Sequence, residues 1–525
     1  MNTIEESRRR FLKGCAAASA IGAVGPGLFF SGSAHAANGH DTVVSVFLRG
    51  GMDGLNVVIP VAGEDRVHYE QARPDLAIAA SGTYGALPLT LATGSATGFG
   101  LHPAASGLRD LWNDGLLAIV QCCGLLTSVT RSHFDAQLSI DLGTPGQQGI
   151  GSGWLARALA TQPGIGGTPP LPGLAVNSRQ PANFNGSTSA LTMSSPGDFE
   201  LNAGAWSWQR ARDNSPAGLV GVNDVLESMW SPGATGLEQH GARAERALRV
   251  IAQQPYGALP ADWPTTAFAR QLWTVAQSIQ MNLGLRYATV DLGGWDTHEG
   301  QGTAGSGYHY FQNKIQELSQ ALSAFNRTLA ASGHLSRVTT VVQSEFGRRV
   351  RENANRGTDH GYGNPMLVMG GTVNGRRLYG NWLGLDPQVL SPYYGDVPVT
   401  TDHRRVLSEI LIRRMRNPNL GAVFPGYGGY TPLGLMKGTD LAPVGMAVAA
   451  APAAVAAPVA GSRPRPASPR PPRPASPRPA TPPPSSRPSP SQPRQEPPRG
   501  WSGRLQREVM RLQGRLERWL REVMP

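Results

Sequence analysis

The chain has 525 residues, of which 40% are hydrophobic and 16% charged, and its formal net charge is +11. This length exceeds what a single hydrophobic core usually organises, so we expect more than one part. The positive charge lies at the ends, because residues 461–499 hold eight Arg and one Glu, and residues 500–525 hold six Arg and three Glu. The body between the ends is close to neutral, which excludes the basic groove of a nucleic-acid-binding protein.

The first 36 residues read as an export signal. Residues 7–13 (SRRRFLK) precede a weakly apolar run, and Ala34-His35-Ala36 follows it as a cleavage site. This order is typical of twin-arginine signal peptides, so we expect a periplasmic or secreted protein. A membrane-spanning helix is the poorer interpretation, because the run is barely long enough and lacks a second charged flank.

The first strand is expected over residues 42–48 (TVVSVFL), a continuous apolar run of the kind buried in parallel sheets. Gly50-Gly51 then allow a tight turn before Asp53. An Asp at the exit of a strand can approach a metal ion. The alternative is a turn aspartate that bonds its own backbone.

A second apolar strand is expected over residues 116–122, and Ser132 follows at the start of a predicted helix. Free N–H groups and the helix dipole favour negative charge at such a position. Ser132 is therefore a candidate nucleophile or metal ligand, and Arg131 could hold an oxyanion. The structural alternative for Ser132 is an N-cap.

Acid and imidazole side chains follow a third strand, expected over residues 286–292. Asp296 and His298 come directly after Gly293-Gly294, and a helix is predicted over residues 310–331. Carboxylate and imidazole are the usual ligands of zinc and related divalent ions. An isolated pair of this kind could also be solvated surface.

The fourth cluster lies between strands expected over residues 338–343 and 366–369. Glu345, Asp359 and His360 occupy the loop between these strands. In open α/β sheets, ligands bind where the carboxyl ends of strands give way to loops. Together, the clusters predict a site for one or two divalent ions (zinc, or calcium, magnesium or manganese) with a hydroxyl beside it, which could activate a serine or water.

Five ordered blocks, over roughly residues 41–430, resemble the signatures of a bacterial, twin-arginine-exported domain-of-unknown-function family, number fifteen-oh-one. The blocks are RGGMDGLN from Arg49, RSHFD from Arg131, GGWDTH from Gly293, SEFGR from Ser344 and GTDHG from Gly357. That family is usually placed in the alkaline phosphatase and sulfatase superfamily. The resemblance implies a doubly wound, mostly parallel α/β sheet with divalent metals at the strand ends and a Ser or Thr nucleophile.

The resemblance also implies roles by position. It makes Ser132 the nucleophile and Asp53 the first-strand metal aspartate, and it makes Asp296 with His298 the acid–histidine pair of one metal. Glu345 stands where the superfamily commonly has an Asp-His pair. His360, beside Asp359, resembles the late histidine that precedes the next strand.

Four parts are expected along the chain. Residues 37–445 form the α/β domain, with residues 150–284 as a cap or insertion over the site. Residues 446–499, rich in Pro, Ala and Arg, form a disordered linker. Residues 500–525 form an amphipathic helix, which would bind an anionic membrane surface or another copy of the chain.

Two functions fit these features. The first is an exported, metal-dependent hydrolase of phosphate or sulfate esters that acts on a small anionic substrate. The alternative is a non-catalytic binding or assembly protein of the cell envelope, which keeps the fold and attaches through its basic tail and amphipathic helix. Fold alone does not decide between them, because function depends on the site.

Overall fold

The computed structural model describes residues 40–165, 169–194 and 256–446, together with short pieces between residues 228 and 242. The expected signal peptide, linker and C-terminal amphipathic helix lie outside these residues. Among the helices that the structure describes, none is both long and apolar enough to cross a membrane.

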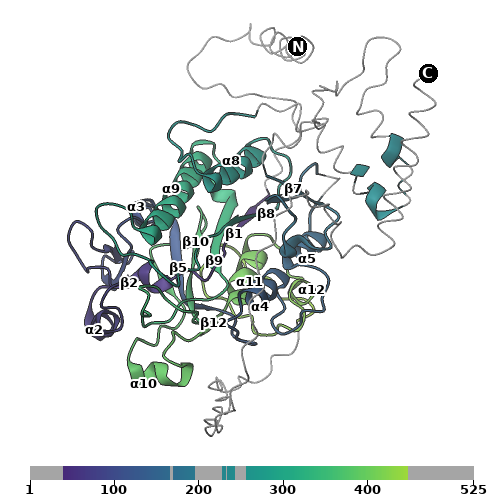
Figure 1. Ribbon diagram of the computed structural model, residues 1–525. Helices are drawn as coiled ribbons and strands as arrows, with labels where there is room; N and C mark the ends of the chain where they lie inside the picture. Colours follow the sequence, from purple (N-terminus) through teal and green to yellow (C-terminus); the bar gives the residue numbers. More distant parts are fainter. Residues whose placement is uncertain are drawn as a thin grey trace, which may run out of the picture. The chain divides into compact units, whose positions relative to one another are not determined.

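A nine-stranded sheet forms the centre of the domain (Figure 1), in the order β11-β5-β10-β9-β1-β8-β6-β7, with β12 also paired to β5. Its strands are β1 (Thr42–Leu48), β5 (Leu117–Gly124), β6 (Gly173–Val176), β7 (Ala190–Met193), β8 (Tyr287–Leu292), β9 (Val338–Ser344), β10 (Asn364–Met369), β11 (Leu378–Tyr379) and β12 (Thr401–Asp402). All pairs are parallel except those of β10, which runs antiparallel to β9 and β5. The predicted α/β class with a mostly parallel sheet is confirmed.

Helices cover both faces of this sheet (Figure 1). Because successive side chains of a strand point to opposite faces, β1 contributes to two cores. Val44 and Val46 pack with α3 (Ser106–Asn113), α8 (Ala267–Gln280) and α9 (Tyr310–Ala331). Val43 packs in a second core with α5 (Trp154–Ala160), α11 (His403–Arg413) and α12 (Leu420–Val423). Burial on both faces explains why the central strands are apolar throughout.

The remaining elements are short. An antiparallel sheet joins β2 (Val58–Pro60), β4 (Ala96–Leu101) and β3 (Leu87–Thr90), in that order. The other helices are α2 (Gly63–Ala72), α10 (Pro387–Leu390) and α4 (His133–Leu142), which lies at the site. Short 3-10 turns lie at Gly54–Asn56, Ala182–Phe184, Leu335–Arg337 and Ser391–Tyr393.

Three elements within residues 150–284, namely β6, β7 and α8, belong to the main sheet and its cover. Strands β6 and β7 extend the main sheet beyond β8, and α8 packs on one of its faces. These strands are only four residues long, so the sequence offers little apolar pattern from which to predict them.

The parallel strands bring their exits to one edge of the sheet. Leu48, the last residue of β1, is level with Leu292 at the end of β8 and with Ser344 at the end of β9. Because β10 is antiparallel, its first residue, Asn364, lies at the same edge, opposite Cys123 near the end of β5. The loops after β1, β5, β8 and β9 and the loop that leads into β10 therefore meet there.

Candidate metal centre

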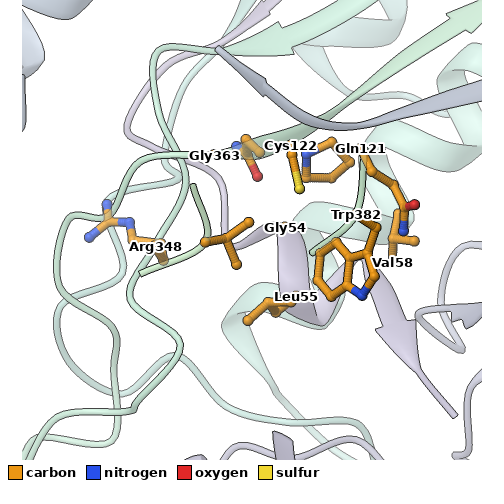
Figure 2. Close-up of a pocket in the computed structure, with 11 residues that line it drawn as sticks. Gly54, Leu55, Val58, Gln121, Cys122, Arg348, Gly363 and Trp382 are labelled. Atoms are coloured by element: carbon orange, nitrogen blue, oxygen red, sulfur yellow. The ribbon is translucent and has the colours of Figure 1, made fainter. Parts of the chain in front are cut away.

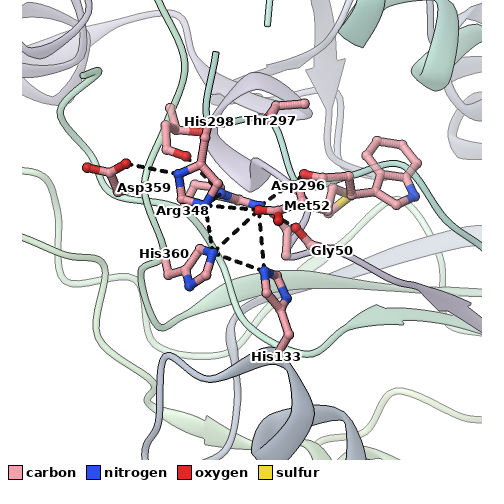
Figure 3. A network of polar contacts seen from close by, with 12 residues as sticks. Gly50, Met52, His133, Asp296, Thr297, His298, Arg348, Asp359 and His360 are labelled. Atoms are coloured by element: carbon pink, nitrogen blue, oxygen red, sulfur yellow. Dashed lines mark hydrogen bonds and ion pairs between the residues drawn. The ribbon is translucent and has the colours of Figure 1, made fainter. Parts of the chain in front are cut away.

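Two histidines and one aspartate converge at this edge. His133 is the first residue of α4, Asp296 lies in the loop after β8, and His360 lies in the loop before β10. Their ligand atoms all lie within 4.8 Å of one another. His133 Nε2 is 2.9 Å from His360 Nε2, and Asp296 Oδ1 is 3.3 Å and 3.4 Å from these two nitrogens (Figure 3). Imidazole and carboxylate are the donors that zinc and related ions prefer, so this triad could hold a metal ion.

His298 borders the same point. Its Nε2 lies 2.8 Å from His360 Nε2 and 3.1 Å from Asp296 Oδ1. The side chains of Asp296 and His298 are 48% and 42% exposed, whereas those of His133 and His360 are 21% and 22% exposed. One side of the cluster is therefore open to solvent, as in catalytic metal sites, which keep a position free for water or substrate.

Each histidine is oriented through its other ring nitrogen. His360 Nδ1 lies 2.7 Å from the carbonyl oxygen of Arg131 and must donate to it, because a carbonyl can only accept. His133 Nδ1 lies 2.7 Å from Glu345 Oε1, and His298 Nδ1 lies 3.0 Å from Asp359 Oδ1. Acceptors at Nδ1 fix the tautomer that leaves the Nε2 lone pair free, which is the usual arrangement around metal-binding histidines.

The surroundings of Asp296 keep its carboxylate ionised. Burial would raise the pKa of Asp296, but the hydrogen bond and charge of Arg348, with the charges of His133 and His298, outweigh it and lower this pKa to about 2. The hydrogen bond to Glu345 raises the pKa of His133, whereas burial lowers the pKa of His360. Asp296 is therefore ionised over the physiological range, as a metal ligand must be.

Arg348 connects the surrounding loops through hydrogen bonds. It is not among the site candidates from the sequence. Its fully buried guanidinium donates to Gly51 O at 2.5 Å, to Thr358 O at 2.8 Å, to Asp296 Oδ1 at 2.5 Å and, at closer range, to Gly50 O. A guanidinium has five N–H donors in a rigid fork, so it can hold several loops at fixed spacing. Its positive charge also balances Asp296.

The double glycine after β1 makes this close packing possible. Gly50 and Gly51 have φ values of +122° and +67°, which side chains rarely allow. A Cβ at Gly50 would lie 2.6 Å from the backbone nitrogen of Asp296. The predicted tight turn is confirmed. It allows the loop that carries Asp296 to approach the backbone that follows β1.

Two of the predicted metal ligands lie behind the triad and support its histidines. Glu345 is buried, and its carboxylate also accepts from Gln137 Nε2 at 2.7 Å and from Gly50 N at 2.8 Å. Burial would raise the pKa of Glu345, but these hydrogen bonds and that of His133 lower it. Hydrogen bonds from Asn353 and His298 lower the pKa of Asp359. Both carboxylates therefore face His Nδ1 atoms, and neither belongs to the triad.

Ser132 and Arg131 directly precede His133. Ser132 is the N-cap of α4, and its Oγ accepts from Asp135 N at 3.4 Å, as the structural alternative predicts. The Arg131 guanidinium pairs with the buried carboxylate of Asp396 and lies 4.4 Å from the ring centroid of Tyr362. Arg131 thus contacts the centre through its backbone carbonyl.

Asp53 lies in a neighbouring buried network. Its two oxygens accept from Arg73 Nη1 at 2.6 Å and from Arg73 Nη2 at 2.9 Å. Gln301 Nε2 donates to Asp53 Oδ2 at 2.6 Å. Both carboxylate oxygens are therefore engaged by side-chain donors, and Asp53 is not part of the triad.

His133 is the member of the triad that sequence reasoning missed. It lies in the RSHFD block, beside Arg131 and Ser132, the two residues of that block that the sequence made site candidates. The available signal was a histidine at the first helical position after a buried strand. Such a residue faces the edge where strands end.

A pocket beside the centre contains no metal-binding cluster. It is lined mainly by apolar groups that include Leu55, Val58 and Trp382, with Arg348 at its border (Figure 2). Cys122 also lines it, and burial raises the pKa of this thiol to about 12. Cys122 and Cys123 are both free and buried, as is typical of cysteines that pack as small hydrophobic side chains.

A family model described as "Protein of unknown function (DUF1501)" matches residues 128–407, which is slightly more than half of the chain. The matched region contains His133, Asp296 and His360. No curated protein matches the chain.

Proposed function

We propose that this chain, which belongs to the DUF1501 family of proteins of unknown function, is an exported, metal-dependent hydrolase of phosphate or sulfate esters. The observation that carries the proposal is the convergence of three imidazole nitrogens on one carboxylate oxygen, at the open edge of the sheet. We also propose that the chain is related to the alkaline phosphatase and sulfatase superfamily, because its order of strands and motifs is compatible with that relationship.

In this proposal His133, Asp296 and His360 hold the ion. A bound divalent ion would supply Lewis acidity to an ester oxygen and would make a hydroxyl group more acidic. Glu345, the Arg131 carbonyl and Arg348 keep the donors at fixed positions, so little reorganisation is needed when the ion binds.

His298 is the proposed proton acceptor. Its Nδ1 donates to Asp359, which leaves the Nε2 lone pair directed at the centre, and its side chain is 42% exposed. An imidazole held by a carboxylate in this way can take the proton of an attacking hydroxyl, from Ser132 or from water. His133, Asp296 and His360 would supply three protein ligands to the ion, which is the number that catalytic zinc sites commonly use alongside water or substrate.

Two arginines favour an anionic substrate. Arg131 and Arg349 both lie beside Asp396, with side chains 31% and 40% exposed. Arg131 lies two positions before the ligand His133, and Arg349 directly follows Arg348. Their charges would attract an anionic ester to the open side of the centre.

Metal content and ester hydrolysis test the proposal. The purified protein should contain a divalent metal, measured by mass spectrometry of the elements, and should hydrolyse aryl phosphates or aryl sulfates. His133→Ala and His360→Ala should lose both metal and activity, whereas His298→Gln should retain metal and lose activity. His334→Ala is the matched control, because His334 precedes the amino end of β9 at the opposite edge of the sheet.

A protein that stays metal-free in zinc, manganese and calcium and hydrolyses neither ester would contradict the proposal. If that inert protein bound anionic vesicles through residues 446–525, the alternative of an envelope-binding protein would replace it.

Export through the twin-arginine route rests on residues 7–13 alone. Replacement of Arg8 and Arg9 by Lys should leave the protein in the cytoplasm when cells are fractionated. Unchanged export of this variant would argue against that route.

A further inference from the structure

The two loops that carry Asp296, His298 and His360 share a buried support. Thr297 lies between Asp296 and His298, and Thr358 lies directly before Asp359 and His360. Thr358 N donates to Thr297 O at 2.9 Å, so the loops are joined through their backbones. The two threonines are buried, with 4% and 0% of their surface exposed.

A single amide side chain connects both threonines to the core. Gln301 is fully buried, and its Oε1 accepts from Thr297 Oγ1 at 2.7 Å and from Thr358 Oγ1 at 2.9 Å. Its Nε2 donates to Asp53 Oδ2 at 2.6 Å. The amide therefore binds both ligand loops on one side and the Asp53–Arg73 pair on the other.

The chemistry of these partners fixes the orientation of the amide. An ionised carboxylate can only accept, so the NH₂ group must face Asp53, and the carbonyl must face the two hydroxyls. Arg73, which is fully buried, donates to both oxygens of Asp53 and holds that carboxylate in place. Both polar atoms of the Gln301 side chain thus have defined partners. The amide group cannot rotate by 180° without losing hydrogen bonds.

We infer that Gln301, held by Asp53 and Arg73, is a positioning residue that sets the spacing between the Asp296–His298 loop and the His360 loop. The inference rests on the proposed metal centre and adds to it a residue that touches neither metal nor substrate. It also gives Asp53 a function different from the metal ligand that the sequence suggests. Supporting residues of this kind typically change metal affinity by about 10- to 100-fold when they are replaced.

The test measures Co²⁺ binding by the full chain, because the visible absorption of Co²⁺ reports both its affinity and the geometry of its ligands. Gln301→Met keeps the length of the side chain and removes its three hydrogen bonds. We expect the Co²⁺ Kd to rise by about 10-fold or more and the absorption bands to change shape. The unchanged ligands should still bind the ion at higher concentration.

Gln162→Met is the matched control. Gln162 is also buried, and it bonds Met415 O at 2.6 Å and the Tyr287 hydroxyl at 2.5 Å. Tyr287 begins β8, whereas Asp296 follows its end, so the control lies at the far edge of the sheet. This variant should lose stability to a similar extent and keep the wild-type Kd and spectrum.

If Gln301→Met does not fold, Thr358→Val removes only one of the hydrogen bonds and should still raise the Kd several-fold. Wild-type affinity and an unchanged spectrum in the folded Gln301 variant, or in Thr358→Val where that variant replaces it, would overturn the inference and leave the metal centre intact. Failure of the unsubstituted chain to bind Co²⁺ would overturn the metal centre, and the inference with it.

Discussion

His133 Nε2 lies 2.9 Å from His360 Nε2, although the two residues are 227 positions apart in the chain. The Nδ1 atom of each ring faces an acceptor, so the nitrogens without a hydrogen are turned toward each other. Two such nitrogens repel at this distance unless a proton or a metal ion lies between them. A shared proton or metal ion would satisfy this pair, and the metal predictions depend on this relationship.

Metal should stabilise the fold through this pair. The unfolded chain lacks the assembled site, so an ion at a hundred times its Kd should raise the free energy of unfolding by about 2.7 kcal/mol. Calorimetry should show a higher Tm with Zn²⁺ or Mn²⁺, and a chelator should reverse the shift. His133→Ala should abolish the shift, whereas His334→Ala should keep it. An equal shift in both variants would place the metal elsewhere.

Ser132 can be tested as cap and as nucleophile separately. Ser132→Ala removes the cap of α4 and should lower the free energy of unfolding by about 0.5–1 kcal/mol. This value lies in the lower part of the range for lost N-caps because the capping hydrogen bond is 3.4 Å long. Ser132→Asn keeps a capping oxygen and should retain wild-type stability. We expect both variants to bind metal and to lose ester hydrolysis, because both lack the hydroxyl. Full activity of the Asn variant would show that water, and not Ser132, attacks the ester.

Asp53 should matter for stability because its pair with Arg73 is buried. Asp53→Asn leaves the guanidinium of Arg73 without a countercharge, and breaking a buried pair in this way costs about 3–5 kcal/mol. Denaturant unfolding should show this loss. The double variant Asp53→Asn/Arg73→Met, which buries no charge at this position, should regain part of it. A loss below 1 kcal/mol, as expected for the exposed control Asp75→Asn, would contradict this prediction.

Stability should depend on pH through Asp141. Its burial raises its pKa to about 6, despite the ion pair with Arg49 at 3.1 Å. An unfolded Asp titrates near pH 3.9, so between about pH 4 and 6 the folded chain keeps a proton that the unfolded chain has released. The contribution of Asp141 is therefore fully present below about pH 4, and it is lost as pH rises through about 6.

Asp141→Asn should remove this component. Relative to wild type, the variant should gain about 2–3 kcal/mol on going from pH 4 to pH 7, from about two pKa units at 1.36 kcal/mol each. Unfolding curves across this range measure the difference. A pH-independent difference between wild type and Asp141→Asn would contradict the assignment.

Local patterns were sufficient for the central strands and the longest helix. The apolar run over residues 42–48 predicts β1 with its observed bounds, and the pattern over residues 310–331 does the same for α9. Thr266 and Asp402 cap the helices that follow them, through hydrogen bonds to Ala269 N and Arg404 N. These features depend on side chains a few positions apart, so a single sequence contains the information.

The sequence by itself determined that acids and imidazoles follow buried strands, and therefore that a polar edge exists. Only the tertiary structure decided which of them meet. The antiparallel direction of β10 brings His360 beside His133. The Asp53 carboxylate accepts hydrogen bonds from Arg73 and Gln301, and the Glu345 carboxylate faces Nδ1 of His133. The physical reason is that a ligand set depends on strand order, direction and competing partners, which are long-range properties that no local pattern encodes.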